Sequence, residues 1–201
     1  MLDRPDLWPS PVPLWQAAPE AVAAGLSGQT DDDAMSLSGP WRLLLLGDGS
    51  PTRHLQSLTG LEVTVDVIAM APDPSPGTEA PAEVAELDAP LLRRQVWLRC
   101  GGQILAWAES WWNQTEADQH LRERNQPIWR SLTANRAELY REVDGLALVE
   151  APHLATGFGQ SGPYWSRHYR FFRGGRELTV IREVFSPALE RWLGPAQHIA
   201  S

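Results

Sequence analysis

The stretch that decides the fold is LLRRQVWLRCGGQILAWAESWW, residues 91–112. Two apolar runs flank Gly101-Gly102, and a glycine pair between such runs is typical of a tight β-hairpin. Residues 164–187, YWSRHYRFFRGGRELTVIREVFSP, repeat the arrangement around Gly174-Gly175. Two hairpins with few long helices favour an α+β domain, in which helices cover one face of a single antiparallel sheet.

Length and charge limit the classes of function. A chain of 201 residues is long enough for one well-filled domain. The 25 acidic and 17 basic residues give a net charge of −8, the wrong sign for attracting nucleic acid or an anionic membrane surface. We therefore expect a small-molecule partner and no nucleic-acid partner. The oligomeric state cannot be read from the sequence, and a monomer is the simplest expectation.

The remaining composition indicates a cytoplasmic protein without a metal site. Cys100 is the only cysteine, so no internal disulfide can form and a cysteine-rich metal site is excluded. The five histidines show no metal-ligand spacing. No segment approaches the ~20 apolar residues that cross a bilayer, and the N-terminus lacks the basic and apolar regions of a secretory signal.

Residues 1–40 differ in composition from the rest of the chain. They contain several prolines, an alanine-rich stretch and the acidic run Asp31-Asp32-Asp33. We expect a weakly ordered N-terminal extension over residues 1–40 and a folded domain over residues 41–201. Within that domain, Ser50 and Pro51 predict the start of a short helix that ends near Gly60, and residues 61–70 alternate as a strand does. The glycine-rich residues 151–163 are predicted to form a mobile loop.

Two charges lie on apolar strand faces. Because side chains alternate along a strand, Arg94 shares a face with Val96, and Glu183 with Ile181 and Phe185. A buried charge needs a partner or a wet cavity. A two-residue turn would place Arg94 opposite Glu109, ~5 Å apart at Cβ, as a structural pair. The alternative is that Arg94 and Glu183 line one cavity, where the arginine binds a ligand carboxylate.

The same alternation assigns the neighbours of Glu183. A regular hairpin turning at Gly174-Gly175 puts Ser166 and His168 on the face of Glu183. It turns Arg167 to the opposite face, where a surface charge is the expectation.

Three blocks of the chain resemble the chorismate pyruvate-lyases, also called 4-hydroxybenzoate synthases, including their cyanobacterial and plastid relatives. The first is LLLLGDGSPTRHLQSLTGLEVTVDVI, the second LLRRQVWLRCGGQILAWAESWWN and the third WSRHYRFFRGGRELTVIREVFSP. In this resemblance, which spans roughly residues 41–193, Arg94 falls on the family's substrate-binding arginine and Glu183 on its active-site glutamate.

The resemblance implies a sheet of about six strands with helical flaps over an enclosed site. It implies a cofactor-free elimination that converts chorismate to 4-hydroxybenzoate and pyruvate, for quinone biosynthesis. Arg94 would bind the ring carboxylate, and Glu183 would contact the C4 hydroxyl region and could assist proton removal. Ile128 falls where a backbone amide touches the substrate.

Two departures leave other functions open. The family position after Ser50 usually offers a backbone amide, which Pro51 lacks, so this contact is missing or shifted to Thr52. Trp129 replaces a small residue beside Ile128. One alternative is therefore a non-catalytic effector domain of the same fold that binds an aromatic carboxylate. Another is a scaffold without a ligand, in which Glu109 alone would satisfy Arg94.

Overall fold

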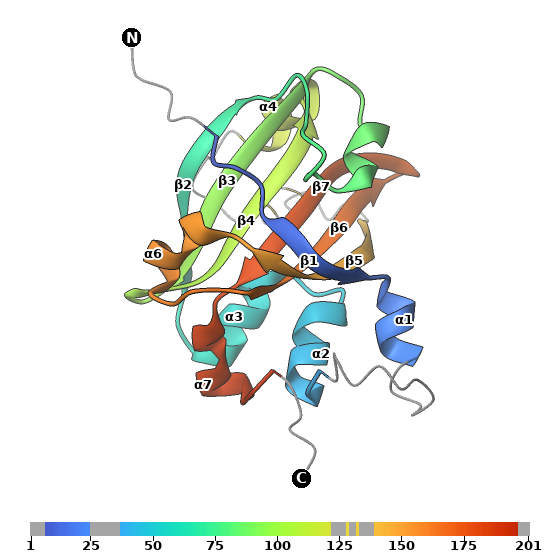
Figure 1. The fold of residues 1–201 in the computed structure, drawn as a ribbon. Coiled ribbons are helices and arrows are strands. Elements are labelled where there is room, and N and C mark those ends of the chain that lie inside the picture. Colours follow the sequence, from blue (N-terminus) through green and yellow to red (C-terminus); the bar gives the residue numbers. More distant parts are fainter. Residues whose placement is uncertain (1–6, 25–36, 122–127, 129–131, 133–138, 197–201) are drawn as a thin grey trace.

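A computed structural model describes residues 7–24, 37–121, 128, 132 and 139–196. Seven antiparallel strands form one curved sheet in the order β1-β5-β6-β7-β4-β3-β2 (Figure 1). The predicted α+β class with a single antiparallel sheet is confirmed. The strands are β1 Val12–Ala17, β2 Val63–Pro72, β3 Leu91–Cys100, β4 Gln103–Asn113, β5 Tyr140–Glu150, β6 Tyr164–Arg173 and β7 Arg176–Phe185.

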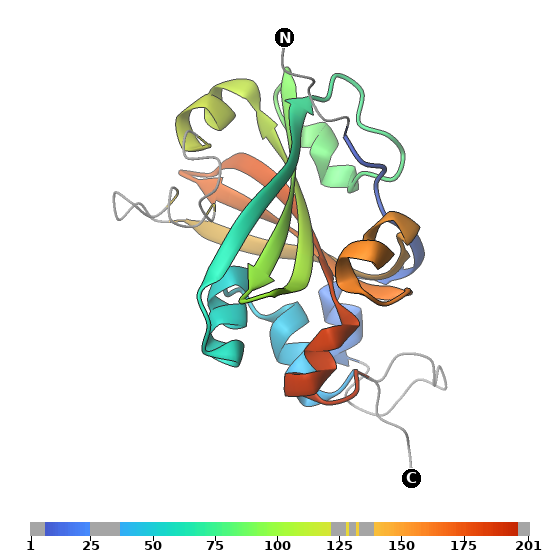
Figure 2. The same ribbon diagram turned by 90° about the vertical axis from the view of Figure 1, so that its left-hand side faces the viewer.

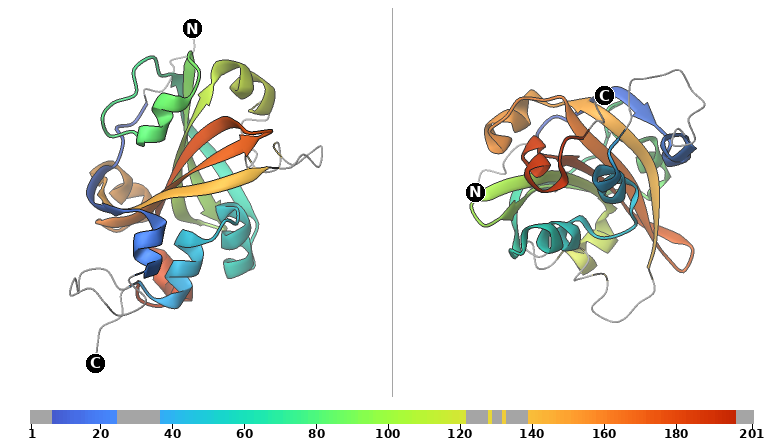
Figure 3. Two further views of the ribbon diagram at one scale, coloured as in Figure 1. Left: turned by 90° about the vertical axis from the view of Figure 1, so that its right-hand side faces the viewer. Right: turned by 90° about the horizontal axis from the view of Figure 1, so that it is seen from below.

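Short helices fill the connections between the strands. The α-helices are α1 Pro19–Ala24, α2 Gly39–Leu46, α3 Pro51–Thr59, α4 Gln114–His120, α6 Ala155–Phe158 and α7 Glu190–Leu193, and the 3₁₀ helices are η2 Ala82–Glu86, η3 Pro152–Leu154 and η4 Pro187–Leu189. Seen from below, α2, α3 and α7 lie across one end of the sheet (Figure 3). None of the helices in the described part of the chain is long and apolar enough to cross a membrane.

The core between helices and sheet lies on the face that we call the front. Helix α3 begins with Pro51 and ends at Gly60, whose φ of 71° suits a residue without a side chain. Trp41 and Leu45 of α2 and Leu55 of α3 are buried in one cluster with residues of β2, β3 and β7. These helices close one end of the front face and leave the middle of that face for the site described below.

The opposite face, here called the back, is also covered, although helices were expected over one face only. Figure 2 shows the segment between β2 and β3, which includes η2, and helix α6 on the same side of the sheet. Phe158 packs edge-on against Trp97, and a Cβ added to Gly157 would lie 2.6 Å from that indole. Part of the predicted mobile loop, residues 152–158, is therefore helical and packed.

Each glycine hairpin carries a β-bulge that changes the register. The turns are as predicted, since Cys100 pairs with Gln103 and Arg173 with Arg176. One extra residue then follows in β4 and in β7, Leu105 and Leu178 respectively, and both leucines are buried. Beyond a bulge every pairing shifts by one residue, which changes the partner and the shared face of each side chain.

Part of the N-terminal segment belongs to the sheet. Residues 12–17, expected to be weakly ordered, form β1 and pair with β5. The sheet therefore has seven strands where about six were expected. Strand β1 is an edge strand that contains Pro13 and an irregularity between Pro13 and Trp15. The division of the chain at residue 40 stays a prediction.

Candidate active site

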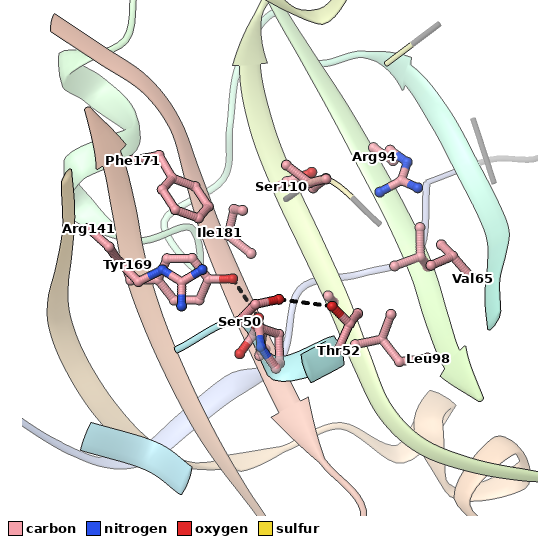
Figure 4. Close-up of a pocket in the computed structure, with 15 residues that line it drawn as sticks. Ser50, Thr52, Val65, Arg94, Leu98, Ser110, Arg141, Tyr169, Phe171 and Ile181 are labelled. Atoms are coloured by element: carbon pink, nitrogen blue, oxygen red, sulfur yellow. Dashed lines mark hydrogen bonds between the residues drawn. The ribbon is translucent and has the colours of Figure 1, made fainter. Parts of the chain in front are cut away.

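A cavity lies between the front face of the sheet and the N-terminus of α3 (Figure 4). Its volume is about 50 Å³, so a ring-sized ligand enters only if wall side chains move. Its lining is mainly apolar, with polar groups at both sides. The residues that matter below are Ser50, Thr52, Arg94, Arg141, Tyr169 and Glu183.

Arg94 reaches the cavity from β3. It lies opposite Ser110 of β4, not opposite Glu109, because the bulge at Leu105 moves the register by one residue. The expected pair of Arg94 with Glu109 is therefore wrong. Arg94 is 2% exposed, and burial lowers the pKa of its guanidinium to about 10. It remains positively charged at neutral pH and lies among Val96, Leu98 and other apolar lining residues.

Glu183 reaches the same cavity from β7 and is 1% exposed. Arg167 donates from Nε to its Oε2 at 2.9 Å, and the Tyr169 hydroxyl donates to its Oε1 at 2.6 Å. Burial, with the negative charge of Glu183 as a further cause, raises the pKa of the Tyr169 phenol, which therefore stays protonated and donating. Each carboxylate oxygen has a fixed donor and keeps a lone pair for a ligand.

Arg167 joins Glu183 to the loop between α2 and α3. The bulge at Leu178 puts Arg167 directly opposite Glu183, so the expected surface charge is fully buried. Its Nη1 donates to the carbonyls of Leu44 and Gly47 at 2.8 Å, and its Nη2 donates to the Gly49 carbonyl at 3.2 Å. The guanidinium satisfies carbonyls at the negative end of α2 and orients the glutamate.

Ser166 and His168 correspondingly lie on the back of the sheet. Ser166 pairs with Val184 and His168 with Arg182, so the expectation that they share a face with Glu183 is wrong. His168 Nε2 lies 3.2 Å from Glu83 Oε2, outside the cavity.

The start of α3 forms one wall of the cavity. Pro51 and Thr52 are both buried, and the hydroxyls of Ser50 and Thr52 are 2.8 Å apart. The preceding loop packs closely on this helix, since a Cβ added to Gly49 would lie 2.0 Å from the His54 imidazole. Thr52 is thus at the cavity, as expected if it takes over the contact that Pro51 cannot make.

Ile128 also lines the cavity. It packs beside the apolar cluster that contains Leu92, Trp112 and Phe171. Trp129, the bulky departure next to it, lies outside the described residues, and so does most of the segment that joins α4 to β5. The four residues predicted for the site, Thr52, Arg94, Ile128 and Glu183, all line this one cavity.

Arg141 brings a second positive charge to the cavity, from β5. Its guanidinium lies over the rings of Tyr169 and Phe171, 4.5 Å from each ring centroid. Its Nη1 donates to the Asp48 carbonyl at 2.7 Å and also to the Gly49 carbonyl. Figure 4 shows Arg94 and Arg141 on opposite sides of the cavity, with Ser50 and Thr52 between them.

A different buried carboxylate occupies the back of the sheet. Glu109 is fully buried and accepts hydrogen bonds from Arg93 and Arg182. Ser10 and Gln95 also donate hydrogen bonds to the Glu109 carboxylate. Gln95 in addition exchanges two hydrogen bonds with the Trp8 backbone, at 2.7 and 2.9 Å. This cluster fastens the N-terminal segment to the sheet, and none of its members lines the front cavity.

Comparison with known proteins identifies the family. A family model described as "Chorismate pyruvate-lyase Rv2949c-like" matches residues 45–193, which include the cavity residues named above. The chain belongs to this family. The resemblance found in the sequence is thereby confirmed, and the matched region runs from α2 to α7.

Relatives of this lyase-like chain include two proteins named "Uncharacterized protein ycf21". That of Porphyra purpurea is 31% identical over 153 residues, covering 76% of this chain and 83% of the relative. That of Cyanophora paradoxa is 28% identical over 151 residues, covering 75% and 78% respectively. The relationship therefore extends over most of both proteins.

The fold also occurs in solved structures of another protein, PhnF. The effector domain of PhnF from Mycobacterium smegmatis superposes with a TM-score of 0.54 at 16% identity, covering 72% of this chain and 92% of that domain. A second structure of PhnF gives a TM-score of 0.53. At this identity the likeness concerns the fold alone.

Sequence reasoning missed three residues of the candidate site. Strict alternation puts Arg167 on the wrong face of the sheet, and no pattern in the sequence singles out Tyr169 or Arg141. The pairing of Arg167 with Glu183 could have been found only by expecting a bulge. Arg141 lies on a strand whose sequence, ELYREVDGLALVE, gave an ambiguous pattern.

Proposed function

We propose that this protein is a chorismate pyruvate-lyase that releases pyruvate from chorismate and forms 4-hydroxybenzoate, without a cofactor, for quinone biosynthesis. The observation that carries the proposal is that Arg94 and Glu183, from strands β3 and β7, line one largely apolar cavity. An apolar site with a few convergent polar groups suits an aromatic acid.

The charges at the cavity favour an anionic substrate. Arg94 and Arg141 line it together with Glu183, and Arg167 lies behind the glutamate. Among the described residues, this arrangement leaves a surplus of positive charge in a chain whose net charge is −8. In the proposed complex Arg94 binds the ring carboxylate with two parallel hydrogen bonds, a geometry that suits a planar guanidinium.

The proposed reaction breaks two bonds to ring carbons, C4–H and C3–O. The C4 proton leaves, a double bond forms between C3 and C4, and the electrons of the C3–O bond go to the enolpyruvate oxygen. Protonation of enolpyruvate gives pyruvate, and the ring becomes aromatic. Because aromatisation drives the elimination, the enzyme mainly holds the substrate in a reactive pose. Glu183 faces the C4 hydroxyl region in this pose, where it binds the substrate and assists proton removal.

The remaining predicted contacts come from α3 and from the segment beyond α4. Thr52 supplies a polar contact in place of the amide that Pro51 lacks. The Ile128 amide supplies another, and its side chain covers the ring. These roles, like those of Arg94 and Glu183, rest on the positions of the residues in the cavity wall. A cytoplasmic location remains the expectation from the sequence.

The direct test is product formation from chorismate. Purified protein is mixed with chorismate, 4-hydroxybenzoate is followed by chromatography, and pyruvate by a coupled lactate dehydrogenase assay. We expect equal amounts of both products. Glu183→Gln should lower kcat about 100-fold or more if the carboxylate takes the proton, whereas an unchanged kcat would limit it to binding.

The second candidate is a non-catalytic domain that binds an aromatic carboxylate. It is favoured by the superposition on a domain named as an effector domain, with 92% of that domain covered. In the same experiment such a protein would bind 4-hydroxybenzoate in calorimetry and form no product above the spontaneous rate of chorismate breakdown. That result would end the lyase proposal.

A further inference from the structure

Arg141 has unused binding capacity at the cavity. Its Nη1 is occupied by the carbonyls of Asp48 and Gly49. Its Nε is buried and has no hydrogen-bond partner among the described residues. A buried donor without a partner lowers the stability of the folded state, so its presence calls for an explanation such as a ligand.

Arg167, which lies on the same side of the cavity, has a hydrogen-bond partner for each of its three guanidinium nitrogens. Arg167 uses its Nε on Glu183 and its Nη1 and Nη2 on carbonyls of the loop that follows α2. Each guanidinium nitrogen of Arg167 therefore binds a group of the protein itself, whereas Nε of Arg141 has no partner among the described residues.

The two arginines that line the cavity are well separated. They belong to β3 and β5, which have β4, β7 and β6 between them. With strands ~4.8 Å apart, the two backbones are about 19 Å apart along the sheet before its curvature shortens the distance. Two long side chains that point into the cavity from opposite sides can bind two acidic groups of one ligand (Figure 4).

We infer that Arg141 is the anchor for a second carboxylate, so that the site selects a dicarboxylate over a monocarboxylate. The inference rests on the proposed function and deepens it: Arg94 binds the ring carboxylate, and Arg141 binds the carboxylate of the enolpyruvyl group that leaves. The stack on Tyr169 and Phe171 holds the guanidinium flat and limits the rotamer entropy lost on binding. Of the two arginine contacts, the ring product keeps only the one with Arg94 after the elimination, and pyruvate keeps only the one with Arg141, so the two products can leave separately.

The test compares two ligands that differ in their acidic groups. Chorismate carries both carboxylates, and 4-hydroxybenzoate carries the ring carboxylate only. Arg141→Gln removes the charge but keeps a donor for the Asp48 carbonyl, and Arg141→Lys keeps the charge. We expect Arg141→Gln to raise KM for chorismate at least tenfold and to change Kd for 4-hydroxybenzoate, measured by calorimetry, by less than about twofold. Arg141→Lys should recover part of the loss.

Arg99→Gln is the matched control. It removes one arginine from β3 that pairs with Asp66 on the surface, with 34% and 48% of the two side chains exposed. Neither ligand should be affected.

Two results would overturn the inference. If Arg141→Gln weakens both ligands equally, Arg141 acts only by supporting the loop that precedes α3. If it changes neither, Arg141 does not meet the ligand. Failure of the proposed function looks different: the wild-type protein would bind chorismate without forming product, and Kd for chorismate would then replace KM in the comparison. A wild type that binds neither compound would refute both proposals.

Discussion

Glu109 and Glu183 are two buried carboxylates on neighbouring strands that face opposite sides of one sheet. Glu109 is held by Arg93 and Arg182, one on each oxygen, under the segment that carries Trp8 and Ser10. Glu183 is held by Arg167 and Tyr169, and it lines the cavity. Both are 0–1% exposed, so burial alone does not distinguish them.

The difference lies in what surrounds each group. Arg93 and Arg182 both donate hydrogen bonds to the Glu109 carboxylate, and both guanidinium groups lie over the Trp111 ring. None of these residues lines the cavity. Around Glu183 one arginine is used internally, while Arg94 and Arg141 present positive charge to the cavity. A buried carboxylate packed among its donors indicates stability, and one that lines a cavity beside further cations indicates a ligand. Variants can break or sharpen this distinction.

The largest effect is expected from Glu109→Ala. Removing the carboxylate leaves Arg93 and Arg182 buried without their common partner, which should cost about 3–5 kcal/mol of unfolding free energy. Urea denaturation followed by tryptophan fluorescence measures the loss. The control is Asp66→Ala, which breaks the exposed pair with Arg99 and should cost about 0–1 kcal/mol. Equal losses in the two variants would contradict the structural role of Glu109.

Arg94→Met should separate activity from stability. We expect kcat/KM for chorismate to fall about 100- to 1000-fold, because a buried charge contact to the substrate carboxylate is lost. The urea midpoint should fall less than in Arg93→Met, because methionine keeps an apolar stem against Val96 and Leu98. Arg93→Met, its neighbour on the back face, should do the reverse and lower stability with little change in kcat/KM per folded molecule. The opposite ranking would place the functional arginine on the back.

Tyr169→Phe tests whether the hydrogen bond that orients Glu183 contributes to activity. The variant keeps the ring under Arg141 and removes the hydroxyl that donates to Oε1 at 2.6 Å. A hydrogen bond to a charged group contributes about 1.5–3 kcal/mol, so kcat/KM should fall about 10- to 100-fold. Tyr164→Phe is the control, because that hydroxyl donates to the Gln160 carbonyl at 2.7 Å away from the cavity. An effect of equal size in both variants would remove the special role of Tyr169.

The smallest effect is expected at a third carboxylate, Glu177, which unlike Glu109 and Glu183 has an oxygen without a hydrogen-bond donor in the described part of the chain. Its Oε1 has no hydrogen-bond partner among the described residues, and burial raises its pKa from 4.5 to about 7, with Arg170 opposing the shift. Between these values the folded protein binds the proton more tightly than the unfolded chain, so this group lowers stability as the pH rises from about 4.5 to 7.

Glu177→Gln should remove that decline. Urea denaturation at pH 5 and pH 8 gives the free energy of unfolding of both proteins. From pH 5 to pH 8 the variant should become more stable relative to the wild type by on the order of 1 kcal/mol, a figure reduced for partial exposure to solvent. An identical pH dependence in both proteins would show that Glu177 titrates normally.

Much of the fold follows from local sequence signals. The glycine pairs predict both hairpins, Ser50-Pro51 and Gly60 delimit α3, and alternation assigns Arg94 and Glu183 to apolar faces. These signals act over a few residues. They suffice because turn geometry and helix ends are decided by the backbone preferences of glycine and proline.

The partners across the sheet could not be predicted in this way. Leu105 and Leu178 read as ordinary strand residues, yet each adds one position to its strand and is buried by doing so. Whether such a bulge forms depends on the packing space around the leucine, which a single sequence does not contain. One unforeseen residue in each hairpin accounts for the three wrong expectations about strand faces. These are the Arg94–Glu109 pair, the outward-facing Arg167, and Ser166 and His168 on the face of Glu183.

Strand β1 has a consequence for the behaviour of the protein at high concentration. It covers the outer edge of β5 and thereby becomes the edge itself, with Val12 46% and Leu14 58% exposed. Another chain can add a strand to an apolar edge of this kind, and repeated addition would form a fibre. Pro13 has no amide hydrogen to offer to an incoming strand, and the irregular spacing beside it disturbs the ladder that such growth requires.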